Sequence, residues 1–211
     1  TLRNPKERAI FKIQEGIQRG FREFLTSQNF TEVHTPKINF AGAEGGTNVF
    51  KLDYFGKTVY LAQSPQLYKQ ALVPVYERVF EIGPVFRAEH HDTSRHLNEY
   101  ISMDFEMGYI EDFTDIMNME TGALQYIMNL LKTEYAPEVE LLKVDIPEIK
   151  SIPCIRFKDA KEMCIKKLKN ITDMKDFEPE EEAFLGKWAK KQYNSDFLFV
   201  THYLSAKRPF Y

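Results

Sequence analysis

The sequence has few of the residues and segments that mark secreted or membrane proteins. Its two cysteines, Cys154 and Cys164, are too few for a disulfide framework and have no partners at the spacing of a zinc site. No apolar run approaches the roughly 20 residues that a membrane-spanning helix needs, and the first residues do not resemble a secretory signal. We therefore expect a protein of the reducing cytoplasm that does not bind membranes.

The sequence also lacks an excess of positive charge. Its 28 basic and 31 acidic residues give a formal net charge of -3, so no overall basic field points to nucleic acid. Any binding of nucleic acid is therefore expected to be local or to depend on parts that this sequence does not contain. With 43% hydrophobic residues, the 211-residue chain can bury a core and is expected to form one domain.

The stretch 78–109 is the most informative part of the chain. Residues 79–88 and 101–109 are rich in β-branched and aromatic residues and flank a polar loop, which predicts two antiparallel strands. Side chains alternate between the two faces of a strand. If the polar faces of both strands coincide, one surface of the sheet displays the charged side chains of Arg87, Glu89, Asp104 and Glu106.

Such a surface suits an anionic substrate that also carries a cationic group. Arg87 offers a planar fork of donors for a phosphate or carboxylate, and the carboxylates can hold an ammonium or a metal-bridged phosphate. The alternative is a solvated sheet face, on which opposite charges attract one another only modestly. The long loop, with Arg95, His96 and Asn98, favours a binding site over that alternative.

The same residues resemble motif 2 of the class II aminoacyl-tRNA synthetases. FRAE at 86–89, a polar loop and RHLNE at 95–99 are most similar to aspartyl-tRNA synthetases of the archaeal and eukaryotic type. The resemblance runs along nearly the whole chain. It implies an α+β fold, the class II synthetase catalytic core, in which helices flank an antiparallel sheet.

The first 50 residues extend the resemblance. Asn4 and Pro5 predict a helix start, followed by an apolar stripe at helical spacing: Ile10, Ile13, Ile17, Phe21, Phe24 and Leu25. EVHTPKI at 32–38 resembles motif 1, which implies a homodimer through the segment 4–38. FAGAEGGTNVF at 40–50 resembles a loop that closes over the amino acid, so that Glu44 would contact the substrate ammonium. Ala43 stands where that family usually has serine.

The segment QSPQLYKQ at 63–70 carries the evidence for substrate choice. Pro65 predicts a helix that begins near Gln66, with Gln66 and Lys69 on one face. A solvated lysine on a surface helix is the alternative for Lys69 taken alone. The segment resembles a signature of aspartyl-tRNA synthetases, in which the lysine binds the side-chain carboxylate of aspartate, whereas asparaginyl relatives lack it. If the substrate carried the carboxamide of asparagine instead, the desolvated ammonium of the lysine would be left unpaired, at a cost of a few kcal/mol.

The resemblance implies an ATP-dependent ligase that activates L-aspartate as aspartyl-adenylate and transfers it to tRNA(Asp). Arg87 would hold the α-phosphate and the substrate carboxylate as the catalytic residue, and Glu89 would contact the adenine side of ATP. Arg95, His96 and Leu97 would line the nucleotide, with His96 as a binding residue and not a base. Gln66 and Lys69 would hold the carboxylate end of aspartate. Mg²⁺ would bridge the phosphates, and no metal ligand is assigned to this chain.

The remaining pattern predicts further elements. A helix over 111–135 with Asp112 as its cap would end at Pro137. A strand is expected at 155–157, helices at 159–168 and from Pro179, and a strand at 197–201. The acidic run 178–182 is interpreted as a solvated helix start.

The resemblance also implies that 1–211 is a partial class II catalytic domain. Motifs 1 and 2 are present, whereas motif 3 and the anticodon-binding β-barrel are absent from this sequence. Two other functions remain open. One is a synthetase-like paralogue that makes asparagine from aspartate, ATP and ammonia through the same adenylate. The other is a non-catalytic dimeric module.

Overall fold

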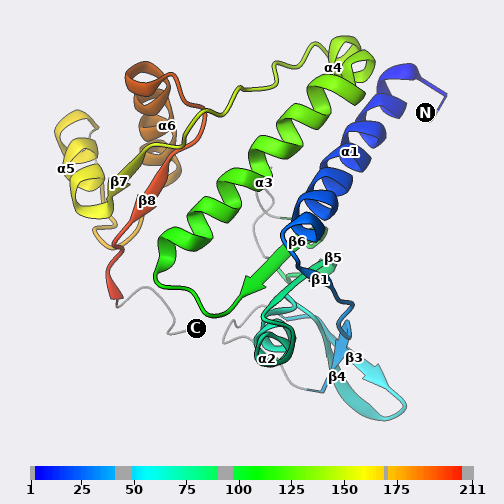
Figure 1. The fold of residues 1–211 in the computed structure, drawn as a ribbon. Helices are drawn as coiled ribbons and strands as arrows, with labels where there is room; N and C mark the ends of the chain where they lie inside the picture. Colours follow the sequence, from blue (N-terminus) through cyan, green and yellow to red (C-terminus); the bar gives the residue numbers. More distant parts are fainter. Residues whose placement is uncertain (1–2, 41–48, 90–96, 169–170, 206–211) are drawn as a thin grey trace. The chain divides into compact units, whose positions relative to one another are not determined.

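The computed structural model describes residues 3–40, 49–89, 97–168 and 171–205. The chain divides into two compact units, Thr1–Leu142 and Lys143–Tyr211, whose elements are labelled in Figure 1. None of the described helices has the length and apolar character needed to cross a membrane.

The centre of the first unit is a three-stranded sheet in the order β1-β5-β6. Strand β1 (Thr31–Glu32) lies parallel to β5 (Arg78–Phe86), and β5 pairs antiparallel with β6 (Glu99–Met107). The pairing runs without interruption from Arg78 opposite Met107 to Phe86 opposite Glu99. The antiparallel pair predicted for this stretch is therefore confirmed.

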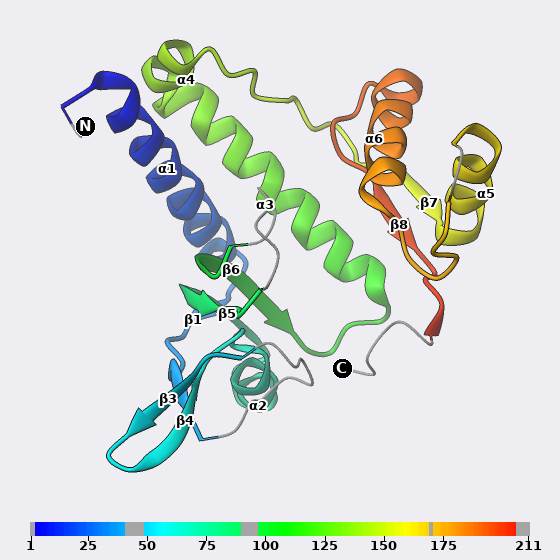
Figure 2. The same cartoon turned by 180° about the vertical axis from the view of Figure 1, so that it is seen from behind.

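Helices cover one face of this sheet. Phe80 of β5 packs edge-to-face on Phe21 with ring centroids 6.0 Å apart, and Phe105 of β6 packs on Phe30 at 5.8 Å. Phe21 belongs to α1 (Pro5–Ser27), which lies beside α3 (Phe113–Glu134) in both views (Figures 1 and 2). This face of the sheet is the hydrophobic side of the unit.

Both long helices begin as predicted. The side chain of Asn4 accepts a hydrogen bond from the Lys6 amide at 3.0 Å, and Asp112 caps α3 through the Thr114 amide at 2.6 Å. The predicted end of the second helix, before Pro137, is confirmed to within one residue, whereas the short helix that follows it was not predicted. Helix α3 ends at Glu134, and Pro137 lies in the first turn of the short helix α4 (Ala136–Leu142), where a proline amide is not needed.

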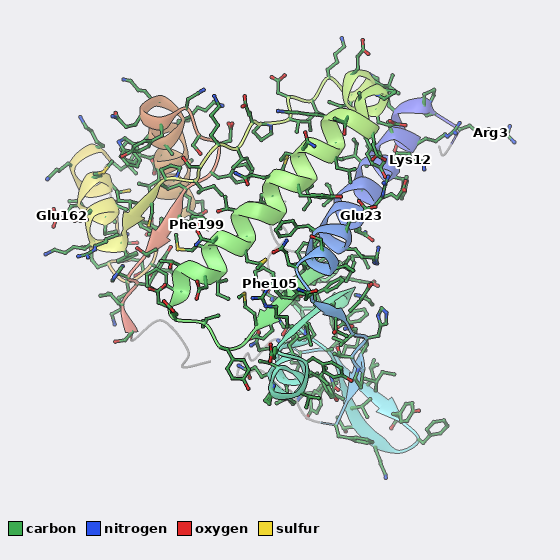
Figure 3. The ribbon with its side chains drawn as sticks, in the orientation of Figure 1. Arg3, Lys12, Glu23, Phe105, Glu162 and Phe199 are labelled. Atoms are coloured by element: carbon green, nitrogen blue, oxygen red, sulfur yellow. The ribbon has the colours of Figure 1, made fainter. Side chains whose placement is uncertain are left out.

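The contact between α1 and α3 differs from the apolar stripe predicted for α1. Ile10 is 44% exposed, whereas Ala9, Gly16 and Gly20 are buried together with Phe21 and Leu25. The small residues allow the helix axes to approach closely, so that large side chains at Gly16 and Gly20 are excluded. Polar pairs border the contact: Arg19 donates to Glu134 at 2.6 Å, and Tyr126 donates to Glu23, labelled in Figure 3, at 3.0 Å.

A second small sheet has the order β2-β4-β3. Strands β3 (Lys51–Tyr54) and β4 (Lys57–Leu61) form a hairpin, closed by Phe55 and Gly56 with φ of 51° and 74°. Strand β2 (Ile38–Asn39) pairs with the other edge of β4. The Ala62 amide donates to the Lys37 carbonyl at 3.0 Å, and its carbonyl accepts from the Phe86 amide at 2.9 Å. Ala62 thus joins the two sheets.

The second unit combines a short parallel strand pair with two helices. Strand β7 (Cys154–Arg156) pairs with β8 (Phe199–Thr201), and α5 (Phe157–Lys167) lies near α6 (Pro179–Tyr193). Ala160, Cys164 and Leu185 form its buried core. The boundaries of these strands and helices lie within two residues of the predicted boundaries.

The interpretation of the run 178–182 as a solvated helix start is wrong for Glu181. This side chain is 1% exposed and accepts two hydrogen bonds from Lys161 of α5, at 2.6 and 2.7 Å. It also accepts from the Glu178 amide at 2.9 Å, as one half of a capping box. The burial follows from a lysine on another helix, which the local pattern could not indicate.

Valine at Gly16 is expected to destabilise the first unit. A Cβ at Gly16 would lie 2.9 Å from side-chain atoms of both Leu131 and Tyr135, which are themselves buried. Overpacking of this kind costs about 1–3 kcal/mol. The control is Gly186→Val on α6, where a Cβ would meet nothing within 4 Å. Chemical denaturation followed by circular dichroism should show the loss for Gly16→Val alone, and equal effects would contradict the close helix contact.

The two thiols are expected to differ in reactivity. Cys154 is exposed and Cys164 is buried. Burial, with a smaller effect of Glu181, raises the pKa of the Cys164 thiol to about 11. The reactive thiolate of Cys164 is therefore almost absent at pH 8 in the folded protein. Iodoacetamide at pH 8 should modify Cys154 before Cys164 in the folded protein, and both cysteines after denaturation. Mass spectrometry measures which cysteine has reacted. Equal rates in the folded protein would contradict this packing.

Candidate functional site

The candidate site is the face of β5 and β6 that points away from the helix-covered side. Ser102, Asp104 and Glu106 occupy alternate positions on β6, and α2 (Gln66–Tyr76) lies along this face. Figure 1 shows α2 on the other side of the sheet from α1 and α3. The sheet thus separates an apolar side from a charged side, as the alternation of the strands requires.

Lys69 is the central cation of this face. Its ammonium lies 3.2 Å from Asp104 Oδ1 and 3.6 Å from Glu106 Oε2. The residue is 3% exposed, whereas the side chains of Asp104 and Glu106 are 23% and 28% exposed. A desolvated ammonium shared by two partly open carboxylates can exchange one of them for a carboxylate of a ligand.

Gln66 joins the same cluster, because the first turn of α2 places it one turn before Lys69. Its side-chain amide donates to Glu106 Oε2 at 3.3 Å. The helix begins where predicted: the Ser64 hydroxyl accepts from the Gln66 amide at 3.0 Å, next to Pro65. Gln66 and Lys69 therefore lie on one face of the helix, as predicted, and both side chains contact the carboxylate of Glu106. Ser102 also donates its hydroxyl to Asp104.

Arg87 lies one residue beyond the end of β5 and extends the pairing. Its amide donates to the Asn98 carbonyl at 2.9 Å, and its guanidinium lies 5.9 Å from the centre of the Tyr100 ring. Tyr100 shares the face of Ser102, Asp104 and Glu106 by alternation. The exposed guanidinium of Arg87 and the ammonium of Lys69 therefore lie on the same face of the hairpin.

The other predicted site residues have different positions. Glu89 is half-buried and donates its amide to the Arg87 carbonyl at 2.8 Å, and Leu97, two residues before β6, is 57% exposed. Glu44, Arg95 and His96 lie outside the described residues, so their roles stay predictions. Among the described residues, no group of three His, Cys, Asp or Glu side chains is arranged to hold a metal ion.

Two charged residues next to this face were missed by the sequence analysis. Glu81 lies directly opposite Asp104 in the strand pairing and is 2% exposed. Lys37 forms an ion pair with it at 2.8 Å. Alternation traced back from Arg87 through Val85 would have placed Glu81 on the polar face. Lys37 could not have been found in that way, because it lies on another segment, which the pairing of β1 with β5 and the hydrogen bonds of Thr35 to Glu81 bring next to β5.

Removal of the Lys69 charge is expected to destabilise the first unit. Lys69→Met leaves Asp104 and Glu106 facing each other without their shared cation, at a cost of about 1–3 kcal/mol for partly exposed carboxylates. Denaturant titration measures the loss. Lys12→Met is the control, because the Lys12–Glu15 pair is exposed on both sides and such pairs contribute about 0–1 kcal/mol. A loss for Lys69→Met no larger than the control's would show that the cluster contributes little.

Comparisons with known proteins show the family of this chain. A family model described as tRNA synthetases class II (D, K and N) matches residues 1–211. The Aspartate–tRNA(Asp/Asn) ligase of Deinococcus radiodurans is 50% identical over 100% of this chain and 49% of the relative. The Aspartate–tRNA(Asp) ligase of Pyrococcus horikoshii is 42% identical over 100% of this chain and 48% of the relative. The chain thus spans about half the length of the curated relatives it matches.

Solved structures show the same fold. The asparaginyl-tRNA synthetase from Pyrococcus horikoshii complexed with asparaginyl-adenylate has a TM-score of 0.86 and 31% identity, over 98% of this chain and 47% of that one. The aspartyl-tRNA synthetase from Entamoeba histolytica has a TM-score of 0.83 and 35% identity, over 100% and 40%. The predicted α+β synthetase core is confirmed by these likenesses. The chain therefore belongs to the class II tRNA synthetases of the D, K and N group.

Proposed function

We propose that the protein carrying this chain is an aspartate–tRNA ligase. It would join L-aspartate to ATP as aspartyl-adenylate, with release of pyrophosphate, and then transfer the aspartyl group to the 3′-terminal ribose of tRNA(Asp). The observation that carries the proposal is the buried ammonium of Lys69 between Asp104 and Glu106. Relatives named as aspartate–tRNA ligases, which match the whole chain, support it.

The cluster around Lys69 suits aspartate better than asparagine. Aspartate brings a side-chain carboxylate that can replace Asp104 or Glu106 on the Lys69 ammonium. Its α-ammonium can pair with the carboxylate released in that exchange, so the number of ion pairs is kept. Asparagine brings a neutral carboxamide, which leaves part of this charge unpaired away from water.

Arg87 is proposed as the residue that acts on the reacting groups. When the α-carboxylate of aspartate attacks the α-phosphorus, a new P–O bond forms, the bond to pyrophosphate breaks and negative charge develops on the phosphate oxygens. A planar, permanently charged guanidinium stabilises such charge with two parallel hydrogen bonds. Its exposure and its place on the same face as Lys69 support this role. Glu89 and Leu97 are proposed to border the ATP.

The cofactor proposed for the reaction is Mg²⁺, which neutralises the ATP phosphates when bound with the nucleotide. The described part of the chain offers no three-carboxylate set for it. Asp104 and Glu106 alone would also first have to give up Lys69. We therefore assign no metal ligand among the described residues and expect the ion to be bound chiefly through the phosphates.

The proposed assembly is a homodimer through the segment 4–38, in the cytoplasm. Exposed apolar side chains within this segment support an interface: Ile10 is 44%, Phe11 57% and Ile38 48% exposed. Large apolar side chains exposed on a helix and on a strand of the same segment are typical of subunit contacts.

Pyrophosphate exchange into ATP tests the proposed activity. In the whole protein with saturating Mg²⁺, exchange is expected with L-aspartate and not with asparagine. Lys69→Met should raise the KM for aspartate about 100-fold, because the carboxylate loses its charge partner, and should leave the KM for ATP nearly unchanged. Lys190→Met is the control, since the Lys190–Asp196 pair is exposed in the second unit.

Other results would change the assignment. Exchange with asparagine alone would overturn the proposed substrate. Exchange with aspartate, followed by formation of free asparagine from ammonia without charging of tRNA, would point to the amidating paralogue. A folded protein that shows no exchange with either amino acid would be a non-catalytic module.

A further inference from the structure

A second ion pair lies beside the Lys69 cluster. Glu81 is 2% exposed and accepts from the Thr35 amide at 2.9 Å, from the Thr35 hydroxyl at 2.7 Å and from the Lys37 ammonium at 2.8 Å. These contacts satisfy the oxygens of a carboxylate that is buried away from water. Lys37 is the cation that balances it, and its side chain is 21% exposed.

Glu81 is a direct neighbour of the proposed substrate site. It lies opposite Asp104 in the antiparallel pairing, so both carboxylates project from the same face of the sheet. Like charges in directly opposite positions repel, and both would attract the same cation. In this structure each carboxylate has its own lysine: Lys37 contacts Glu81, and Lys69 contacts Asp104.

The backbone holds Lys37 in this position. Its carbonyl accepts from the Ala62 amide at 3.0 Å, and its ammonium also donates to the Thr35 hydroxyl at 3.1 Å. Gly83 provides the space, because a Cβ there would lie 3.2 Å from Glu81 Oε1 and 3.5 Å from Lys37 Nζ. The Lys37 ammonium therefore lies over Gly83, whose partner across the strands is Ser102, the residue that donates to Asp104.

We propose that Lys37 and Glu81 are positioning residues for the aspartate site and act through Asp104 and Lys69. By neutralising Glu81, Lys37 prevents this carboxylate from repelling Asp104 and from drawing Lys69 towards β5. Lys69 then stays between Asp104 and Glu106, where a ligand carboxylate can replace one of them. The inference rests on the proposed function, since it concerns the same substrate. Neither residue is assigned a contact with the substrate in this proposal.

A purely structural role is the competing explanation. The Thr35 hydrogen bonds and the Lys37 ion pair also fix the segment after β1 to β5. Loss of such a tie would lower stability, and it would do so whether or not Glu81 is charged. The two explanations therefore differ in what happens when the charge of Glu81 is removed together with that of Lys37.

A double-mutant cycle on the whole protein separates the two roles. Lys37→Met should raise the KM for aspartate about tenfold in pyrophosphate exchange, with the KM for ATP unchanged within about twofold. Glu81→Gln, which keeps an acceptor for the Thr35 amide, should change the aspartate KM less than about threefold. The combination Lys37→Met with Glu81→Gln should return to the value of Glu81→Gln, because no uncompensated carboxylate remains. Lys37→Arg should keep the KM for aspartate near that of the wild-type protein. Lys190→Met is the control for the loss of an exposed lysine.

Each other outcome is decisive. If Lys37→Met lowers the melting temperature but leaves the aspartate KM unchanged, or if the double variant is as impaired as Lys37→Met, the positioning role is wrong. If Lys37→Met does not fold, the inference is decided by Lys37→Arg and the double variant, and an aspartate KM raised tenfold in the double variant overturns it. If the unchanged protein shows no exchange with aspartate, the proposed function itself fails and the inference fails with it.

Discussion

The antiparallel pairing of β5 with β6 is the constraint on which the first unit is built. Nine consecutive residue pairs fix the register from Arg78 opposite Met107 to Phe86 opposite Glu99. A shift by one residue would exchange the two faces and bury the charges. With the observed register, Phe80 and Phe105 meet the rings of Phe21 and Phe30, and Asp104 and Glu106 face α2. One strand pair thus creates both the core and the candidate site.

Charge balance explains why the polar face can be packed at all. Three carboxylates on neighbouring positions, Glu81, Asp104 and Glu106, would repel one another if they were left alone. Two lysines from outside the strand pair compensate them: Lys37 comes from the segment after β1 and Lys69 from α2. Both lysines are held by backbone structure that starts elsewhere in the sequence, so the site is assembled by the joining of three segments. A ligand that carries both charges can enter such a cluster without a net loss of ion pairs.

The second unit shows the same principle in a smaller core. Lys161 and Glu181 form a buried pair with oxygens 2.6 and 2.7 Å from the ammonium, which also donates to the Asp176 carbonyl at 2.9 Å. The pair is fully hydrogen-bonded, which is the condition under which a buried ion pair is tolerated. It links α5 to the start of α6, and its charges act on the thiol of Cys164, which is buried in the same unit.

The sequence by itself determined the elements and the family. Alternation at 101–107, the Asn4–Pro5 and Asp112 helix starts and the Pro65–Gln66 start each reflect an interaction within a few residues, and the structure agrees with them. The tertiary structure alone decided which charges are paired. From the sequence, Glu181 was expected in solvent and Ile10 in the core, and Lys37 was given no role. The environment of each residue is set by elements that are distant in the chain. Periodicity records which side of a helix or strand is polar, but the burial of a charge depends on whether another segment supplies its counter-charge.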